Sequence, residues 1–215
     1  MSVSLPNGST ISLASGYGSA LPVSAATNAN PCVMTSTAHG LSNGDYVEVT
    51  SGWSRLNGRI LRVANVATNT IELEGYDSSS TSTHPAASGT GSVRKVSGWT
   101  QLSQILSSQT SGGDQNFTEY QFLESDIKVR IPTSKAPSGL DLQVADDSTL
   151  AGYVLANAAN EDRLVRACKV LLASGAIILY SSYVSLNPTP SLTVDQVMAV
   201  QVTLSHVNSP IRYSS

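Results

Sequence analysis

Three consecutive stretches within residues 163–206 alternate between apolar and polar side chains, and this pattern constrains the fold more than any other feature of the chain. The alternation is clearest in residues 196–206, where it has the period of two that is typical of a strand with one buried face. The apolar positions there are Met198, Val200, Val202 and Leu204, and the polar ones are Gln201, Thr203 and Ser205. Residues 176–187 follow the same period less strictly, because Ser182 lies among apolar neighbours. A chain with these stretches is expected to be mainly β.

The first of the three stretches, residues 163–172, fits two readings. Leu164, Cys168 and Leu171 also fall at helical spacing, and periodicity alone does not resolve short apolar runs of this kind. The turn at residues 173–175 connects the stretch directly to the next strand, as in antiparallel hairpins. The adjacent hairpin partner favours a strand.

One helix is expected, at residues 148–158. Asp146 and Asp147 precede it, and a carboxylate at a helix N-terminus accepts hydrogen bonds from free backbone N–H groups and favours the helix dipole. The apolar stripe of this helix would be formed by Leu150, Val154 and Leu155. The paired carboxylates would also suit a metal ion or acid–base chemistry. Capping is the more frequent role for acidic residues at a helix start, and we favour it here.

The surface of this protein is expected to be polar without being charged. Only 13% of its residues are charged and its net charge is −3, while Ser, Thr, Asn and Gly are frequent. Such a composition occurs in β-rich proteins and in proteins that are largely covered by copies of themselves. It has no basic patch of the kind that nucleic-acid binding requires, so a high-affinity DNA-binding protein is excluded.

The composition changes along the chain and indicates four segments. Residues 1–30 read as an extended arm or a loosely held strand. Residues 31–76 read as a compact β-module, and residues 77–91 as a flexible Ser/Thr/Gly linker in which His84 is solvated. Residues 92–215 return to strand patterns and are expected to form an antiparallel β-sandwich flanked by the helix.

Tight turns separate the predicted strands of residues 31–76. Asn43-Gly44 and Asn57-Gly58 supply the positive-φ positions that such turns need. The sequence of this segment, AHGLSNGDYVEV and LNGRILRVANVATNTIELEG, resembles that of the small β-barrel first described in ubiquitin-activating enzymes, a module that recurs in phage virion proteins. The resemblance implies a small β-barrel. It carries no activating-enzyme chemistry, because the chain lacks a nucleotide-binding glycine loop and a suitably placed cysteine.

Two residues of this module are candidates for a binding site. His39 lies in a turn without a second metal ligand at suitable spacing, so a turn-stabilising role is favoured over a metal site. Trp53 lies beside a Gly-rich loop. It would either fill a core or interface, which we favour, or offer a platform for a ligand.

The sequence contains no recognisable catalytic, cofactor-binding or metal-binding site. No Ser/His/Asp order, Cys/His pair or phosphate loop appears at meaningful spacing. Cys32 and Cys168 are far apart and are expected to be small buried hydrophobes in a reducing compartment. The N-terminus lacks the features of a secretory signal, and no apolar run approaches the ~20 residues of a membrane span. We therefore expect no enzymatic activity, no cofactor and no membrane contact.

Residues 92–213 present a characteristic order of features. A strand, a long polar loop at residues 107–116 and further strands lead to the turn Val144-Ala145-Asp146-Asp147 before the helix, and then to the hairpin. A Pro-containing break at residues 187–190 and a closing strand that ends in SPIRY at residues 209–213 complete the order. In these features the chain resembles the major tail tube proteins of long, non-contractile-tailed phages.

This resemblance implies a structural virion protein that assembles as hexameric rings, which stack into the conduit for the genome. Its partners would be copies of itself and other tail proteins, namely the tape measure, terminator and distal tail proteins, and DNA would pass through the lumen without specific binding. The protein would be located in the virion tail after assembly in the host cytoplasm. Residues 107–116 and 1–30 would mediate contacts between rings, and residues 31–76 would decorate the outside.

Two other classes of protein remain open at this point. A virion surface protein that binds a host receptor or a glycan through the β-module would present Trp53 to solvent. An enzyme would require that groups isolated in the sequence, such as the three histidines, converge in the fold.

Overall fold

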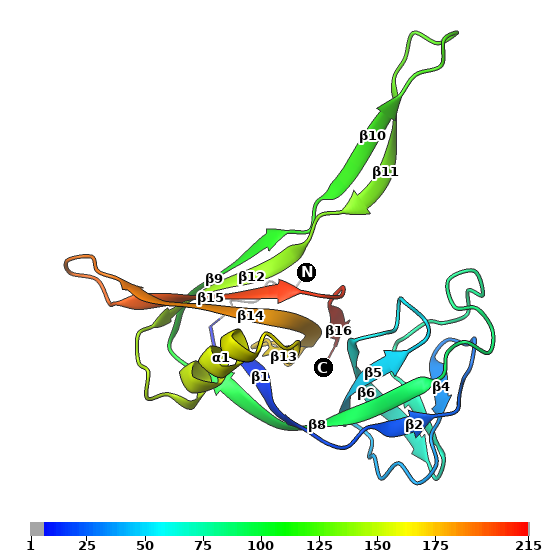
Figure 1. Ribbon diagram of the computed structural model, residues 1–215, viewed down its shortest axis with the longest axis horizontal. Coiled ribbons are helices and arrows are strands. Elements are labelled where there is room, and N and C mark those ends of the chain that lie inside the picture. The colour runs from blue at the N-terminus through cyan, green and yellow to red at the C-terminus, as the bar shows by residue number, and fades with distance from the viewer. Residues whose placement is uncertain (1–6, 215) are drawn as a thin grey trace.

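The computed structural model describes residues 7–214, which form one α-helix and sixteen β-strands (Figure 1). This confirms the predicted fold class, a mainly β antiparallel protein with one flanking helix. Residues 1–6 of the expected N-terminal arm lie outside the described range. The elements are β1 (Thr10–Tyr17), β2 (Leu21–Val23), β3 (Ala25–Ala26), β4 (Cys32–Thr35), β5 (Tyr46–Ser51), β6 (Arg59–Ala67), β7 (Thr70–Leu73), β8 (Gly91–Leu102), β9 (Ile105–Gly112), β10 (Gln115–Tyr120), β11 (Val129–Lys135), β12 (Ser138–Ala145), α1 (Ala151–Asp162), β13 (Arg166–Leu171), β14 (Ile177–Ser191), β15 (Ala199–His206) and β16 (Ile211–Tyr213).

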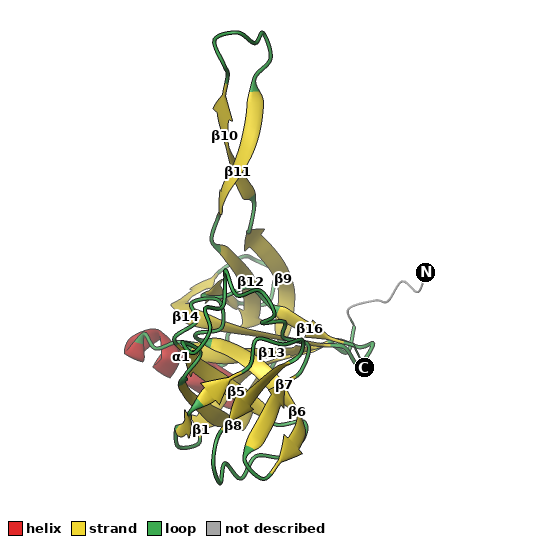
Figure 2. Cartoon of the chain, turned by 90° about the vertical axis from the view of Figure 1, so that its right-hand side faces the viewer, coloured by secondary structure: helices red, strands yellow, loops and turns green. Residues whose placement is uncertain are grey.

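One long antiparallel sheet curls through most of the molecule. Its strand order is β3-β4-β7-β6-β5-β8-β1-β13-β14-β15-β12-β9, with β16 paired to β14 and β2 paired to β8. β10 and β11 form a separate two-stranded ribbon that projects far from the body (Figures 1 and 2). The ambiguous stretch before the 173–175 turn is a strand, β13, which pairs with both β1 and β14.

The first hydrophobic cluster lies inside the part of the sheet that runs from β8 to β9 in the strand order. The strands β14, β15, β12 and β9 form one wall, and β8, β1 and β13 with α1 form the other. The period-2 pattern of the sequence accounts for the cluster, because every second residue of β12, β14 and β15 points inward. Its buried members are Ile11, Leu13, Leu102, Leu142, Val144, Ala156, Ala159, Cys168, Tyr180, Val184, Leu186, Val200, Val202 and Leu204.

The N-terminal strand is more tightly held than the sequence indicated. β1 lies between β8 and β13, and Leu13 and Ala14 are fully buried. The prediction of a loosely held arm is therefore wrong for residues 10–17. Its short apolar run is surrounded by Ser and Gly, which concealed a central strand.

The helix begins later than expected, at Ala151, and ends at Asp162. Its N-cap is Leu150, whose side chain makes no capping hydrogen bond. Asp147 instead accepts hydrogen bonds from the backbone N–H and the hydroxyl of Thr149, which fixes the turn before the helix. The predicted helix N-cap is thus wrong, although the carboxylate does satisfy one backbone donor in the approach to the helix.

A second hydrophobic cluster is surrounded by β2 to β7 and the first half of β8. β2 and β3 follow one another in the chain, so the strand order β2-β8-β5-β6-β7-β4-β3 returns to its start. The buried members are Val23, Cys32, Met34, Leu41, Val47, Val49, Trp53, Leu56, Leu61, Val63, Ile71, Leu73, Tyr76 and Val93. A third, smaller cluster joins the two parts and includes Ala14, Ile60, Val96, Leu179 and Tyr213.

Cationic side chains on aromatic rings reinforce the junction between the two parts. Lys169 of β13 lies over the rings of Tyr46 and Trp99, at 5.2 and 4.6 Å from their centroids. Arg62 of β6 lies 4.6 Å over the ring of Tyr213, whose hydroxyl accepts a hydrogen bond from the Arg62 backbone. Such contacts add to the apolar burial of the joint.

Candidate assembly surfaces

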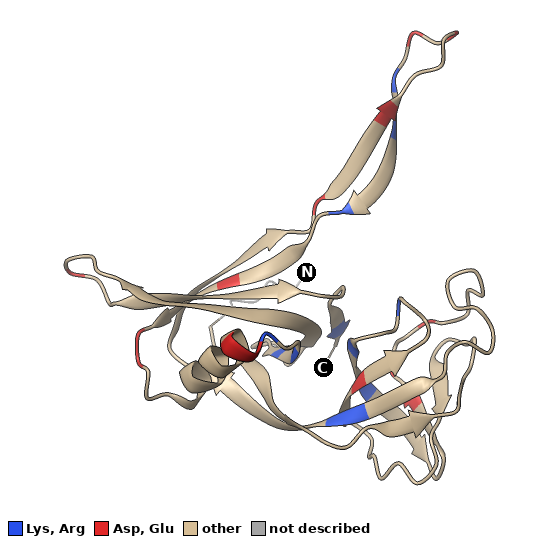
Figure 3. Cartoon of the chain, in the orientation of Figure 1, with Lys and Arg blue, Asp and Glu red and all other residues tan. Residues whose placement is uncertain are grey.

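The outward face of β9, β12, β15 and β14 is a continuous polar surface, which we call the polar face. The register aligns its side chains in rows across the four strands, for example Ser107, Gln143, Gln201 and Asn187. Figure 3 shows few charged residues on these strands. The full set is Ser107, Gln109, Ser111, Gly139, Asp141, Gln143, Gln201, Thr203, Ser205, Tyr183, Ser185 and Asn187.

Asp141 is the one charged member of this set. The hydroxyl of Thr203 donates a hydrogen bond of 2.7 Å to its carboxylate. This hydrogen bond and others from Ser111 and Gln201 hold the pKa of the Asp141 carboxyl below its usual value. The polar face therefore carries one fixed negative charge among neutral hydroxyls and amides.

This four-stranded part of the sheet has two unpaired edges within residues 7–214, namely β9 and the second half of β14. β9 ends the strand order and pairs only with β12. β14 pairs with β13 only as far as Ser182, so residues 183–191 have β15 on one side and no strand on the other. One backbone donor on that edge, the N–H of Leu186, is satisfied by the side chain of Asn160. Free edges of this length invite pairing with another chain.

The ribbon, residues 115–135, has two chemically different faces. Cross-strand pairing places Tyr120 opposite Val129 and Thr118 opposite Ile131 on one face. That face is uncharged, and Phe122 packs edge-on against Tyr120 at its outer end. The other face carries the ion pair between Glu119 and Arg130, 2.8 Å apart. A two-stranded ribbon is marginally stable by itself, so its apolar face requires a cover.

Strands β9 and β11 correct two sequence predictions. The expected long loop at residues 107–116 is mostly β9, the edge strand of the main sheet. The expected break at residues 132–139 begins later, because β11 continues through Pro132 to Lys135. A two-stranded ribbon has no central strand, so a proline there removes no essential ladder hydrogen bond.

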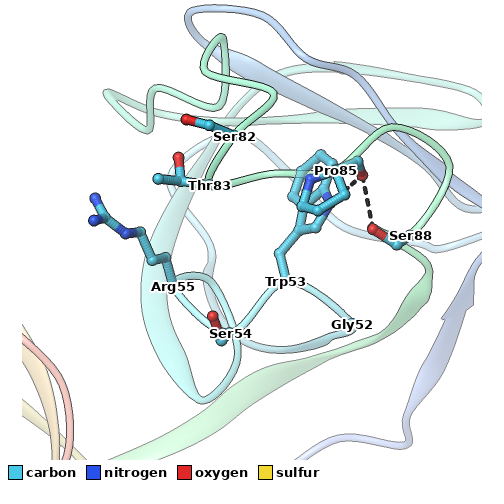
Figure 4. Close-up of a pocket in the computed structure, with 8 residues that line it drawn as sticks. All are labelled: Gly52, Trp53, Ser54, Arg55, Ser82, Thr83, Pro85 and Ser88. Atoms are coloured by element: carbon cyan, nitrogen blue, oxygen red, sulfur yellow. Dashed lines mark hydrogen bonds between the residues drawn. The ribbon is translucent and has the colours of Figure 1, made fainter.

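Trp53 fills the second cluster and does not face solvent. Its side chain is 1% exposed, and its indole N–H donates a 2.8 Å hydrogen bond to the carbonyl of Pro85 (Figure 4). The adjacent cavity of about 380 Å³ is lined mainly by small polar residues and Arg55. The predicted core role of Trp53 is confirmed, and its ring has no free face on which a sugar could stack.

The histidines of this part hold loops in place. His39 is buried, with Nδ1 accepting from the Leu41 N–H and Nε2 2.9 Å from the Ala67 carbonyl, which agrees with the predicted turn-stabilising role. His84 was expected to be solvated and is instead 4% exposed. Its Nε2 lies 2.8 Å from the hydroxyl of Tyr76, and its ring packs edge-on against Trp53. The polar sequence around it gave no sign of this burial.

The segment of residues 77–91 was expected to be flexible, but buried polar contacts fix its path. The hydroxyl of Ser78 is fully buried and donates to the carbonyl of Thr27. The side chain of Asn28 donates to the carbonyls of Ser78 and His84. The side chain of Asn28 and the backbone groups of Thr27 and Ala29 thereby bind the segment that the composition marked as a linker.

No three His, Cys, Asp or Glu side chains of residues 7–214 gather as a metal site would require. Cys32 and Cys168 are buried and unpaired, as predicted, and burial raises the pKa of the Cys168 thiol to about 12. The helix α1 is neither long nor apolar enough to cross a membrane, and it is the one helix in the described range.

Comparison with known proteins gives a family and two structural similarities. A search of curated proteins found no match. A solved structure of the anti-feeding prophage baseplate is similar over 54% of this chain and 85% of its own, with 8% identity and a TM-score of 0.40. The sheath–tube complex of an extracellular contractile injection system in the extended state is similar over 50% and 80%, with 12% identity and a TM-score of 0.35.

The family model described as phage tail tube protein matches residues 51–215. The match includes the four-stranded sheet with its polar face, both free edges, the helix and the ribbon. Because it spans well over half of the chain, we conclude that this chain belongs to the phage tail tube protein family.

Proposed function

We propose that the chain polymerises as stacked hexameric rings into the tail tube of a long, non-contractile-tailed phage, the conduit for the genome. The family is a structural one, and it supports a role in the virion tail. The observation that carries the finer proposal is the four-stranded sheet with one polar face, one buried face and two unpaired edges. Such a sheet is suited to closing with copies of itself around a water-filled lumen.

The strand directions favour ring closure. β9 and β14 lie at opposite edges with two antiparallel strands between them, so they run in opposite directions. A rotation about a ring axis preserves these directions. β9 of one subunit would therefore meet β14 of the next in an antiparallel pair, and every joint would be equivalent. Closure would also remove both exposed edges.

The polar face is suited to line the lumen. Its hydroxyls and amides present no cation that would hold a phosphate, and Asp141 adds a repulsive charge in each subunit. DNA would then pass without specific binding. The opposite face of the same strands is apolar and belongs to the first hydrophobic cluster, so it is not available for this role.

The ribbon is suited to join successive rings. It leaves the sheet at the C-terminal end of β9 and projects beyond the body (Figure 2). Its uncharged face would be covered by a subunit of the neighbouring ring. The exposed apolar side chains of the ribbon and its tip are Phe117, Tyr120, Phe122, Leu123, Ile127, Val129 and Ile131.

We propose that residues 31–76 form a small β-barrel module like that of ubiquitin-activating enzymes, carried on the outside of the tube. The domain limits would be residues 1–30, 31–76, 77–91 and 92–215. Most buried members of the second hydrophobic cluster lie within residues 31–76, which supports a module there, and Val23 and Val93 extend the cluster into the neighbouring segments. Assembly would take place in the host cytoplasm, with the tape measure, terminator and distal tail proteins as further partners, and the chain would need no cofactor and catalyse no reaction.

The test is electron microscopy of the purified protein at high concentration, first unmodified and then with residues 113–137 replaced by Asn-Gly. A two-residue turn suits the end of β9 and β12, where Gly112 pairs with Ser138. We expect hollow tubes from the unmodified chain, and folded monomers or single rings from the variant. The control Glu119→Gln, which removes an ion pair on the other ribbon face, should keep its tubes. Normal tubes without the ribbon would refute its role.

A further inference from the structure

An apolar groove opens at the start of β9, between the two walls of the first cluster. It encloses about 470 Å³ and lies between β9, the start of β1 and the end of β13. None of its lining residues is charged. Leu106 at its rim is 52% exposed. The lining side chains that are apolar are Ile11, Ile105, Leu106, Val170 and Leu172.

The turn between β14 and β15, residues 192–198, is the most exposed apolar segment of the main body. Leu192 is 79% exposed, Val194 86% and Val197 64%. The one charged residue in this turn is Asp195. Side chains of this kind, clustered at the end of a hairpin, indicate a contact with another molecule.

The sheet register places the turn and the groove at the same end of the sheet. Ser107 of β9 lies in the same cross-sheet row as Asn187 of β14. Beyond this row, β9 begins at Ile105 and β14 continues toward the turn. Within one subunit the two features are separated by β15 and β12. They become neighbours when β9 of one subunit meets β14 of the next.

We propose that the β14–β15 turn of one subunit inserts its apolar side chains into the β9 groove of the next subunit in the same ring. This inference rests on the proposed ring. Pairing the two edges in line with the rows carries the turn past Ile105, where the groove opens. An uncharged groove suits the exposed leucine and valines of the turn. Burying these side chains would remove apolar surface from contact with water and so stabilise the contact. The contact would act as a clasp on each joint of the ring.

The ribbon of an adjacent ring is the competing occupant of the groove. Its tip also exposes apolar residues, including Leu123 and Ile127. The two occupants differ in one measurable respect. A clasp within the ring links a closed set of subunits, whereas a ribbon contact links subunits along the tube without limit.

The test is chemical cross-linking of assembled tubes of the variant Leu106→Cys/Val194→Cys with a short bis-maleimide. The native Cys32 and Cys168 are buried, and burial raises the pKa of both thiols, so they should remain unmodified. We expect a ladder on a denaturing gel that stops at the size of one ring. Each single-cysteine variant serves as a control and should give no ladder beyond a dimer.

Two results would contradict the proposed contact between the β14–β15 turn and the β9 groove. Intact tubes that yield only monomers would show that the two positions are not adjacent. A ladder from Leu106→Cys/Ile127→Cys that extends past one ring, with none from the first pair, would assign the groove to the ribbon. If the unmodified chain forms neither rings nor tubes, the proposed function itself fails. This result can be told apart from the two cross-linking results, because both of those require assembled tubes.

Introducing a charge at each of the two positions provides a second readout. Leu106→Lys alone and Val194→Glu alone would each bury an unpaired charge in the joint and reduce the pelletable tube fraction by about tenfold or more. The double variant pairs the two charges across the joint and should recover most of the assembly. Equal loss in the double variant, with folding unchanged by circular dichroism, would contradict the contact.

Discussion

The charge of Asp141 is the residue-scale feature that bears most directly on the proposed DNA conduit. We expect the variant Asp141→Lys to form tubes that retain short duplex DNA, because each subunit would then offer a cation to a phosphate. Retention of a labelled duplex by pelleted tubes measures this effect, and it should fall steeply with added salt. The isosteric Asp141→Asn should form tubes that retain little DNA. Equal retention by the lysine and asparagine variants would show that this face does not line the lumen.

His206 lies at the base of the ribbon, where Nδ1 is 3.1 Å from the hydroxyl of Ser138 and its ring packs against Tyr180. Nε2 is buried without a partner in the described residues, and burial lowers the pKa of the imidazole. The unfolded chain, with a histidine pKa near 6.5, therefore takes up this proton first as the pH falls. The stabilising effect is complete above pH ~6.5 and is lost as the pH falls through the lower folded-state value.

We therefore expect the free energy of unfolding to fall between pH 7 and pH 5 less in His206→Gln than in the unmodified chain. Urea unfolding at a series of pH values measures the difference, which belongs to this residue because all other groups are shared. A steeper fall in the variant would mean that the charged imidazole is stabilised in the folded state. At this scale the sequence predicted the roles of Trp53 and His39, because a tryptophan suits a core and a lone histidine beside a glycine suits a turn. It did not predict the burial of His84, because the residues around it in the chain are polar.

At the scale of elements, the contact of α1 with β8 depends on a glycine. A Cβ on Gly152 would lie 2.5 Å from the carbonyl oxygen of Gln101 and 3.0 Å from the Cα of Leu102, both backbone atoms that have little room to move. We expect Gly152→Ala to destabilise the protein by ~1–3 kcal/mol through overpacking, although alanine is the better helix former. Chemical denaturation measures this, with Ala151→Gly as the control that changes helix propensity without the clash. A more stable Gly152→Ala protein would show that the helix can shift.

The elements themselves were predictable to different degrees. β14 and β15 follow from the alternation of their own residues, and β13 from the hairpin that joins it to β14. The start of α1 was misplaced because Asp147 forms a turn with Thr149, and the N-cap is Leu150, a residue without a capping side chain. β9 was mistaken for a loop because its residues from Ser107 to Gly112 are exposed and either polar or glycine, so this edge strand shows no apolar period. The end of β11 was taken for a break because it contains Pro132.

At the scale of the molecule, β8 ties the two main clusters together. Its first half packs into the second cluster through Val93, and its last residue, Leu102, packs into the first. The third cluster fills the space between them. We expect one cooperative unfolding transition, in which tryptophan fluorescence and far-ultraviolet circular dichroism change together. Two resolved transitions would show instead that the second cluster unfolds as an independent unit.

The arrangement of the whole molecule was the part least accessible from the sequence. The central place of β1 depends on partners about 90 and 160 residues away along the chain, as its pairing with Leu102 and Leu171 shows. The two free edges likewise follow from where the sheet ends, which no local pattern encodes. The fold class was predictable because it requires only alternation, whereas the assembly surfaces required the strand order.

The two ends of the four-stranded sheet are chemically different, with the ribbon at one end of β9 and the groove at the other. A tube built from such subunits would have polarity. One of its ends would present the ribbons and the other end the opposite surface of the subunits. A cap shaped for bare ribbons would not fit the other end. The signals that start growth and stop it would therefore reside in two distinct caps, each free to evolve without altering the subunit contacts along the shaft.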